Sequence, residues 1–308
     1  MPTAVKILEV LIPILIGLGL RLAKIFGDRE GDVLRRFVVR FTVPVMVFFS
    51  TYGADRSDLA AVPAMMASIV MLTAALFPLG YLCGLPFEGM GRRTAVHACC
   101  IFGNYGWLGY GVTEVLLGKA GFLRAVFFAT LWWPVFYGFG LSIGLIHAKG
   151  RKGGVPLKSA LSVTLPVLVA LVGGLAVNLS GWQWNKQNLL RASLERFGDM
   201  TVPLILFSVG VMLNVSGMRR ALKAALLISA VQLVVSPLIG WAIACVLTHD
   251  PTSRAVIILQ AAMPVATLTP LLAENFEMDL DVANTSIVMS TILAMITLPV
   301  VACLAVRQ

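Results

Sequence analysis

The chain has 308 residues, of which 58% are hydrophobic and 13% are charged, and its formal net charge is +9. Soluble domains carry about 25% charged residues, so this chain cannot cover itself with polar surface and needs lipid as part of its solvent. Its Lys and Arg residues stand at the ends of apolar runs and form no basic stripe with interleaved aromatic residues, which argues against nucleic-acid binding. Composition therefore predicts an all-α membrane protein rather than a soluble enzyme.

Apolar segments follow one another along almost the whole chain. A membrane-spanning helix needs about 20 mostly apolar residues. The predicted spans cover residues 5–25, 34–53, 60–84, 93–117, 122–147, 159–179, 197–215, 219–247, 253–273 and 282–306. Between the sixth and seventh spans, residues 181–196 contain Trp182 and Trp184 and predict a short amphipathic segment at the membrane interface.

The two halves of the chain repeat weakly. The Thr-Val-Pro motif that starts at Thr42 recurs 159 positions later, at Thr201. We therefore predict a first five-helix repeat over 1–147, a linker over 148–158 and a second repeat over 159–308. Because five spans is an odd number, the second repeat enters the membrane from the opposite side, which is the inverted-repeat plan of many secondary transporters.

The distribution of basic residues predicts the orientation of the chain. Of the 24 Lys and Arg residues, the predicted topology places 15 on the side of the 148–158 linker. By the positive-inside rule this linker is cytoplasmic and both termini are outside. The expected location is the plasma membrane, the inner membrane of a bacterium.

Two predicted spans are interrupted at corresponding positions. The fourth carries a cluster of glycines around Asn104, namely Gly103, Gly106, Gly109 and Gly111, and the ninth contains Pro264 and Pro270. Such residues also occur in membrane helices for packing alone. A matched pair of breaks is the stronger indication of a transporter binding site, because it frees backbone groups near the midplane. The positive N-termini of half-helices suit an anion, and freed carbonyls suit a cation or a polar substrate group.

These interrupted segments resemble a known family. The stretch FGNYGWLGYGV is similar to the fourth-helix signature of the auxin efflux carrier family, and AAMPVATLTPLLAENFEMD is similar to its ninth-helix signature. GDMTVPLILFSVGVML and STILAMITLPV resemble the seventh and tenth helices. The resemblance covers essentially the full length. The chain lacks the long cytoplasmic loop of the large plant members and so resembles the compact, bacterial branch.

The resemblance implies a fold and a set of site residues. It implies a ten-helix inverted-repeat fold related to bile-acid sodium symporters, with a scaffold bundle and an elevator-like transport domain that contains crossed, broken helices 4 and 9. Substrates of the family are organic anions such as indole-acetate, malonate or malate. The family's helix-4 asparagine maps to Asn104 and its crossover proline to Pro264. We take as substrate-binding candidates these two residues and their neighbours Gly103, Tyr105, Gly106, Val265 and Ala266.

Three further polar residues are candidates for coupling or for support of the site. Glu114 follows the fourth-span break, and an intramembrane carboxylate is a functional candidate by default. It either carries a coupling proton or helps bind sodium, or it lies at the outer interface near Lys119. Gln260 lies one turn before Pro264 and can meet substrate or the broken backbone. Arg40 either snorkels to the cytoplasmic face or meets a carboxylate substrate.

Catalytic and metal chemistry find little support in the sequence. His97, His147 and His249 lie in three different regions, and none has an acidic partner at motif spacing, so neither a catalytic site nor a metal site is predicted. His97 could titrate near neutrality, although a structural role is the better interpretation. The five cysteines lie in apolar segments without a CxxC pair and are expected to be free thiols.

We therefore predict a secondary carrier of small organic anions that works by alternating access. It has no cofactor, and no Walker A motif indicates ATP coupling. The driving force is a proton gradient, a sodium gradient or the substrate gradient alone. The rival interpretations are a sodium-coupled symporter of the bile-acid type, a transporter-like sensor and an intramembrane enzyme. Expected partners are the anion and membrane lipid, without nucleic acid. Carriers of this resemblance are often homodimers, and the sequence leaves the oligomeric state open.

Overall fold

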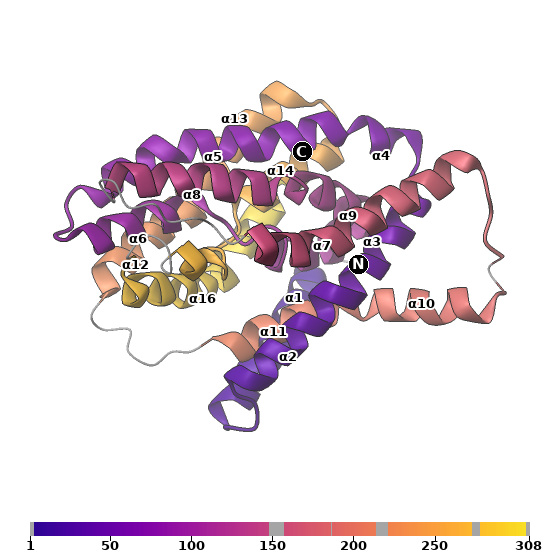
Figure 1. Ribbon diagram of the computed structural model, residues 1–308, viewed down its shortest axis with the longest axis horizontal. Coiled ribbons are helices and arrows are strands. Elements are labelled where there is room, and N and C mark those ends of the chain that lie inside the picture. The colour runs from indigo at the N-terminus through magenta and orange to yellow at the C-terminus, as the bar shows by residue number, and fades with distance from the viewer. Residues whose placement is uncertain (1–2, 148–156, 186, 214–220, 273–277, 306–308) are drawn as a thin grey trace. The chain divides into compact units, whose positions relative to one another are not determined.

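The computed structural model describes residues 3–147, 157–185, 187–213, 221–272 and 278–305 (Figure 1). Within these residues the regular secondary structure is helical, and the one isolated β-bridge joins two non-helical segments, at Gly103 and Val265. Most of the predicted linker, residues 148–156, lies outside the described residues, and Leu157 already begins a helix.

The chain forms two compact units, and each of them takes elements from both predicted repeats. Unit 1 comprises Met1–Val62, Tyr110–Val126 and Leu157–Leu213, and unit 2 comprises the rest. A compact unit is therefore not the same as a sequence repeat, because helices of the two repeats pack together inside each unit.

Unit 1 contains eight elements of its own and the middle of a ninth. They are α1 (Thr3–Leu22), α2 (Asp28–Phe37), the π-helix η1 (Val38–Thr42), α3 (Val43–Tyr52), α4 (Arg56–Ala60), α9 (Leu157–Ser180), α10 (Leu189–Asp199) and α11 (Thr201–Met212), with the Tyr110–Val126 part of α7 (Leu108–Ala129). Within this unit α1 packs on α11, and α3 packs on α9.

Unit 2 contains the interrupted helices and the elements that pack around them. They are α5 (Val62–Gly84), α6 (Met90–Ile101), the two ends of α7, α8 (Trp132–His147), α12 (Leu222–Ala230), the π-helix η3 (Val231–Val235), α13 (Ser236–Leu247), α14 (Pro251–Ala261), the 3₁₀-helix η4 (Thr269–Leu272) and α16 (Leu280–Ala305). Here α12 packs on α16, α13 on α14, and α6 on both α8 and α16.

Glycines let two pairs of helices in unit 1 pack so closely that the backbone of one helix touches that of the other. The two contacts lie at corresponding positions of the two predicted repeats. A Cβ atom at Gly17 of α1 would overlap the carbonyl oxygen of Phe207 in α11. A Cβ atom at Gly174 of α9 would lie 2.5 Å from the carbonyl oxygen of Phe48 in α3. Phe48 and Phe207 are 159 positions apart, as are the two Thr-Val-Pro motifs. Small residues at such positions are typical of helix contacts in membranes.

Unit 2 also contains two close helix contacts at glycines, and these too lie at corresponding positions of the two predicted repeats. A Cβ atom at Gly80 of α5 would lie 3.0 Å from the carbonyl oxygen of His97 in α6. A Cβ atom at Gly240 of α13 would lie 3.4 Å from the carbonyl oxygen of Ile257 in α14. Both members of the second pair lie 160 positions after those of the first. Equivalent helix pairs therefore use equivalent close approaches.

Prolines explain both π-helices. Pro44 follows η1 and Pro237 follows η3 by two residues each. A proline inside a helix has no N–H to donate, and its ring clashes with the carbonyl four residues earlier, here in Arg40 and Leu233. Widening the preceding turn to the π form relieves that clash while the helix continues.

By length and composition, four helical stretches of the described chain can cross a membrane. They are Arg56–Gly84, Leu108–His147, Leu222–Leu247 and Leu280–Ala305. The stretch Leu108–His147 contains the end of the predicted fourth span and all of the predicted fifth span. Gly118, with φ +71°, marks the boundary between these two spans. Three predicted spans are each divided into two helices in the structure. The fourth and ninth are divided at their predicted breaks, and the seventh is divided at Met200, between α10 and α11.

The predicted interfacial segment 181–196 differs from the structure in one respect. Residues 182–185 and Asn188 are irregular, and α10 begins at Leu189 and runs on, past one residue, into α11. The Asn188 side chain accepts a hydrogen bond from the N–H of Arg191 and caps α10. The end of the predicted amphipathic segment is therefore the start of the seventh helix.

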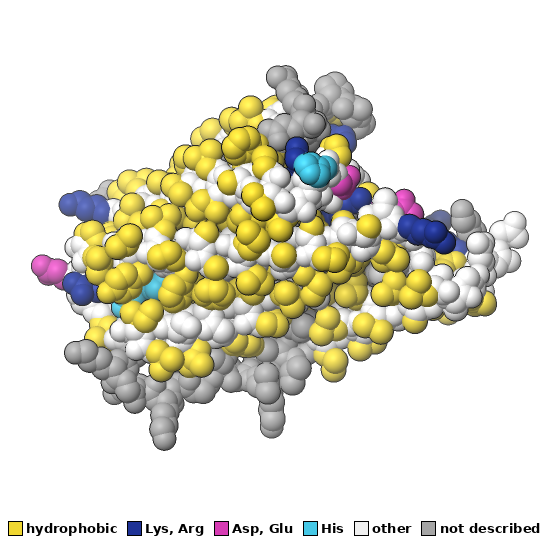
Figure 2. All heavy atoms as spheres, turned by 90° about the horizontal axis from the view of Figure 1, so that it is seen from above, with side chains coloured by type: hydrophobic (Ala, Val, Ile, Leu, Met, Phe, Trp, Pro, Cys, Tyr) yellow, Lys and Arg dark blue, Asp and Glu magenta, His cyan; other side chains and the backbone are white. Residues whose placement is uncertain are grey.

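The surface agrees with a membrane environment. Figure 2 shows hydrophobic side chains over most of the visible face, with few charged side chains among them. Large apolar side chains are exposed on several helices, among them Leu145, Leu179 and Val246, which are 69%, 71% and 78% exposed. Apolar surface on this scale marks contact with lipid or with another protein rather than with water. The structure confirms an all-α membrane fold.

Candidate functional site

The two interrupted helices of unit 2 meet through their non-helical residues. Helix α6 ends at Ile101 and α7 begins at Leu108, while α14 ends at Ala261 and η4 begins at Thr269. The N–H of Asn104 donates to the carbonyl of Pro264 at 2.8 Å, and the N–H of Ala266 donates to the carbonyl of Phe102 at 2.8 Å. Gly103 and Val265 form the antiparallel bridge between these bonds. The predicted crossing of broken helices 4 and 9 is therefore confirmed.

Glycine and proline suit their places in this crossover. Pro264 takes part through its carbonyl oxygen, so its missing N–H leaves no gap in the pairing. A Cβ atom at Gly103 would lie 2.8 Å from Cζ of Tyr105, and the N–H of Tyr105 donates to the carbonyl of Gly103. The buried Tyr105 ring thus needs a glycine at position 103.

Side chains of neighbouring helices satisfy other backbone groups that the breaks release. Ser290 of α16 accepts a hydrogen bond from the N–H of Val265 at 3.1 Å. Gln232 of η3 donates from Nε2 to the carbonyl of Cys99 at 3.0 Å. Ser236 of α13 donates to the carbonyl of Ala261 at 2.7 Å. These three polar side chains hold the ends of α6 and α14 in place because buried backbone groups need partners.

Several polar side-chain atoms beside the crossover remain without a hydrogen-bond partner. They are Nδ2 of Asn104, Oη of Tyr105, Nε1 of Trp107, Oε1 of Gln232, and both Oε1 and Nε2 of Gln260. Asn104 is 4% exposed and Gln260 is 0% exposed. An unpaired buried polar group costs about 1–3 kcal/mol, so a cluster of them indicates a site that a ligand or water completes.

Gly109, in the first turn of α7, contacts the backbone of Asn104 and the side-chain amide of Gln260. Its N–H donates to the carbonyl of Asn104 at 3.0 Å. A Cβ atom at position 109 would lie 2.9 Å from Cδ of Gln260, so the Gln260 amide lies directly against this glycine. Asn104 and Gln260, which are far apart in sequence, thus contact one residue at the start of the second half-helix.

The chain is similar to known transport proteins along most of its length. Residues 2–152 and 155–302 match the model of a family described as membrane transport protein. A relative from Methanothermobacter thermautotrophicus, named an uncharacterized transporter, is 32% identical over 95% of each chain. An uncharacterized transporter of Methanocaldococcus jannaschii is 24% identical over 95% of each chain. The chain belongs to the membrane transport protein family, that of the auxin efflux carriers. It is an integral membrane transporter.

The structure brings most of the predicted site residues of this transporter together. Those it assembles in unit 2 are Gly103, Asn104, Tyr105, Gly106, Gln260, Pro264, Val265 and Ala266. Glu114 and Arg40 belong to unit 1, where Arg40 is exposed on η1. The predicted site residues did not include Trp107 and Gln232. Trp107 stands inside the quoted helix-4 signature, but nothing in the sequence links Gln232 to the carbonyl of Cys99.

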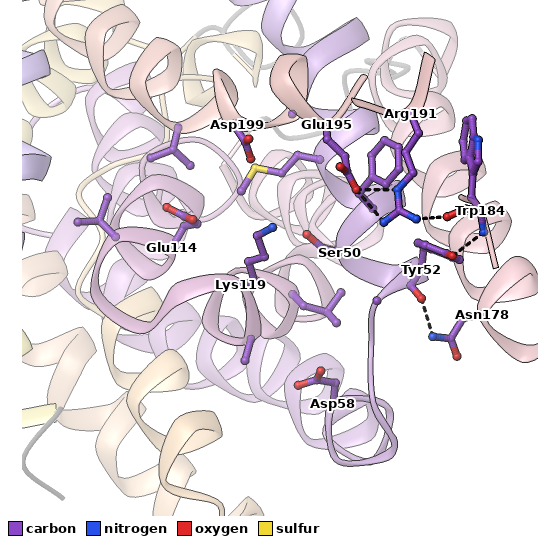
Figure 3. Close-up of a pocket in the computed structure, with 18 of the residues that line it drawn as sticks. Ser50, Tyr52, Asp58, Glu114, Lys119, Asn178, Trp184, Arg191, Glu195 and Asp199 are labelled. Carbon is purple, nitrogen blue, oxygen red and sulfur yellow. Dashed lines mark hydrogen bonds and ion pairs between the residues drawn. The ribbon is translucent and has the colours of Figure 1, made fainter. Parts of the chain in front are cut away.

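Glu114 lines a separate cavity within unit 1 of the transporter. This cavity has a volume of about 1280 Å³, and Figure 3 shows Glu114, Lys119 and Asp199 together on one side of it. Glu9 also lines it. The coupling role predicted for Glu114 stays a prediction, and its carboxylate lies in a different compact unit from Asn104.

Arg191 builds the opposite wall of this cavity (Figure 3). Its guanidinium donates two hydrogen bonds of 3.0 Å to Oε1 of Glu195 and a third to the carbonyl of Trp184. It also lies 5.4 Å from the ring centroid of Tyr52, whose hydroxyl accepts a hydrogen bond from the N–H of Trp184. Asn178 donates to the carbonyls of Tyr52 and Ala54, which fixes the end of α9 to the same wall.

Metal ligands do not gather in the part of the transporter that the structure describes. There, no three His, Cys, Asp or Glu side chains lie close enough to hold a metal ion together. The described cysteines are free thiols, two of which, Cys99 and Cys100, are buried in α6. The chemistry that the site offers is therefore hydrogen bonding by amide, indole, phenol and backbone groups.

Proposed function

We propose that this transporter carries small organic anions by alternating access and binds them at the crossover of unit 2. The observation that supports this proposal best is the set of buried donors without acceptors, Asn104 Nδ2 and Trp107 Nε1, next to the N-terminus of α7. The first turn of a helix carries positive partial charge, because the dipoles of its peptide units point the same way along the helix. Donors of this kind favour a carboxylate over a cation.

The Gln260 amide gives the proposed site a second point of contact. Both of its polar atoms lack partners, and it lies against Gly109 on the first turn of α7. An amide both donates and accepts, so it can meet a second carboxyl, keto or hydroxyl group. The buried site would then prefer compact anions with two polar ends, such as malonate or malate, over indole-acetate, because an indole ring has one N–H donor but no acceptor for the N–H groups of this amide.

We also propose a location for the protein. The excess of Lys and Arg on the linker side supports a plasma-membrane protein with both termini outside. An epitope tag at either terminus should then be accessible to antibody in intact cells. A tag inserted into the 148–158 linker should become accessible only after permeabilisation. Labelling of the linker in intact cells would reverse the proposed orientation.

The charge of the substrate can be tested at Asn104. For an anion, we expect Asn104→Ala to weaken binding about 10–100-fold, because one hydrogen bond to a charged group is lost. We expect Asn104→Asp to weaken it further, because a carboxylate of nearly the same shape would repel the ligand. The measurement is uptake of labelled malonate, malate and indole-acetate into proteoliposomes, with and without sodium and a pH gradient.

The two variants at Asn104 separate the alternatives. A cationic substrate would be transported as well or better by Asn104→Asp than by Asn104→Ala, and that order would refute the anion proposal. Equal transport by wild type and both variants would remove Asn104 from the site while leaving the carrier itself intact. Asn185→Ala, in the irregular segment before α10 of unit 1, is a control that should leave uptake unchanged.

Gly109→Ala should displace the Gln260 amide. The new Cβ atom would lie 2.9 Å from Cδ of Gln260, so this side chain must move. We expect malonate to bind at least about fivefold more weakly, which corresponds to the lower end of overpacking costs. Gly138→Ala, on α8 of the same unit with no atom within 4 Å of the added carbon, is the matched control. Unchanged affinity in Gly109→Ala would exclude contact between Gln260 and substrate.

A further inference from the structure

Two histidines that are distant in sequence form a buried pair in unit 2. His97 lies on α6 and His147 at the end of α8, and Nδ1 of His97 is 3.1 Å from Nε2 of His147. Nε2 of His97 lies 3.0 Å from the carbonyl oxygen of Phe77 on α5. Their exposed fractions are 0% and 8%. The sequence placed these residues in different regions, and the structure brings two of the three histidines into contact.

The contacts determine where the protons lie. The Phe77 carbonyl can only accept, so Nε2 of His97 carries the proton in that bond. In a neutral imidazole the other nitrogen is then bare, so Nδ1 of His97 accepts from Nε2–H of His147. Nδ1 of His147 is left as the unprotonated position. A second added proton would place two N–H groups against each other at 3.1 Å, so the pair can take up one proton but not two.

The surroundings of the pair lack a counter-charge among the described residues. The charged and titratable groups that face it are the Tyr81 phenol from α5, whose ring lies about 6 Å from both imidazoles, and Arg93 from the start of α6. The described salt bridges contain no carboxylate partner for either histidine. A buried cation without a partner is costly, and Arg93 adds repulsion.

We propose that His97 and His147 form a binding site for one proton, filled together with the anion at the crossover. This inference rests on the proposed function. His97 stands seven residues before Asn104, on the helix that leads into the crossover, and both belong to unit 2. A negative charge bound there supplies the counter-charge that the protonated pair lacks. By linkage, the proton strengthens anion binding as much as the anion strengthens proton binding. The proton comes from solvent and returns to it when the anion leaves.

The test is proton uptake upon anion binding. Purified transporter in weakly buffered detergent is titrated with malonate at pH 7.5 while a pH dye records protons and calorimetry records binding. We expect wild type to take up more protons per bound malonate than His97→Gln or His147→Gln, with one extra proton as the upper limit. Both variants keep a hydrogen-bonding amide and should still bind malonate, although more weakly. His249→Gln, which replaces an exposed histidine beside Arg254, is the matched control and should behave like wild type.

Two results would overturn the inference, and they are distinguishable. Malonate binding with the same proton uptake in wild type, His97→Gln and His147→Gln would refute the proton site while leaving the crossover site standing. Absence of binding by malonate, malate and indole-acetate to folded wild type would refute the proposed function and the linkage with it. Asn104→Ala should weaken malonate binding about 10–100-fold, and proton uptake should shift to the same higher malonate concentrations, because the proton is bound only together with the anion at the crossover.

Discussion

Replacement of Arg124 by methionine should lower the free energy of unfolding by about 3–5 kcal/mol, because it leaves a buried carboxylate unpaired. Nη1 of Arg124, on α7, lies 2.5 Å from Oδ1 of Asp58 on α4, and their side chains are 5% and 12% exposed. Asp58 is fixed from its other side by the N-cap Asp55, which accepts a hydrogen bond from the N–H of Asp58. The measurement is chemical denaturation in detergent, followed by tryptophan fluorescence.

A second substitution and a surface pair serve as controls for Arg124. Arg124→Met combined with Asp58→Asn should recover much of the loss, since neither side chain then carries a charge. Arg35→Met breaks the half-exposed pair with Asp32, whose charged atoms are 3.4 Å apart, and should change stability by less than about 1 kcal/mol. If Arg124→Met and Arg35→Met lowered the free energy of unfolding equally, burial of the Arg124–Asp58 pair would not increase its contribution to stability.

Gly210→Ala should be the most disruptive small substitution in unit 1. Its Cβ atom would overlap the carbonyl oxygen of Ile14 and lie 2.7 Å from the backbone nitrogen of Leu18, both on α1. Gly17 meets the facing backbone of α11 in the same way, 2.9 Å from the nitrogen of Val211. Backbone atoms cannot rotate aside as a side chain does, so the two helices must separate. We expect a loss of about 3 kcal/mol, the upper part of the usual range for overpacking.

Gly19→Ala provides a control on the same helix. No atom lies within 4 Å of a Cβ added at Gly19, and alanine favours a helix over glycine by about 1 kcal/mol. This variant should therefore be as stable as wild type or slightly more stable. The same denaturation experiment measures both. If Gly19→Ala and Gly210→Ala destabilise equally, the close packing of α1 on α11 is not what holds unit 1 together.

The sequence predicted the parts of this fold that depend on local chemistry. The lengths of the apolar segments predicted the spans. Gly103 and Pro264 predicted the breaks, because glycine and proline change the local backbone conformation in any helix. Gly118 fell between the predicted fourth and fifth spans, and the structure finds a positive φ there. The site residues nearest the breaks, Asn104 among them, were predicted from these breaks together with the resemblance to the auxin efflux carrier family.

The rest depends on which helix packs against which, and a hydropathy pattern does not contain that information. His97 and His147 are 50 positions apart and meet only because α6 packs on α8. Gln232 reaches the carbonyl of Cys99 only because η3 packs on α6. Likewise, the boundaries of the two compact units differ from those of the predicted repeats, since helices of one repeat pack against helices of the other within each unit.

The paired backbone at the crossover also has a consequence for either half of the chain taken alone. The bonds from Asn104 to Pro264 and from Ala266 to Phe102 relate the two halves as the two strands of an antiparallel ladder are related. A gene that encoded one half would produce a chain whose corresponding edge had unpaired N–H and C=O groups inside a lipid-facing bundle. A second, inverted copy would complete that edge by two-fold symmetry. A chain of half the length would therefore need to pair with a second copy of itself, whereas this chain carries both edges and pairs them within one molecule.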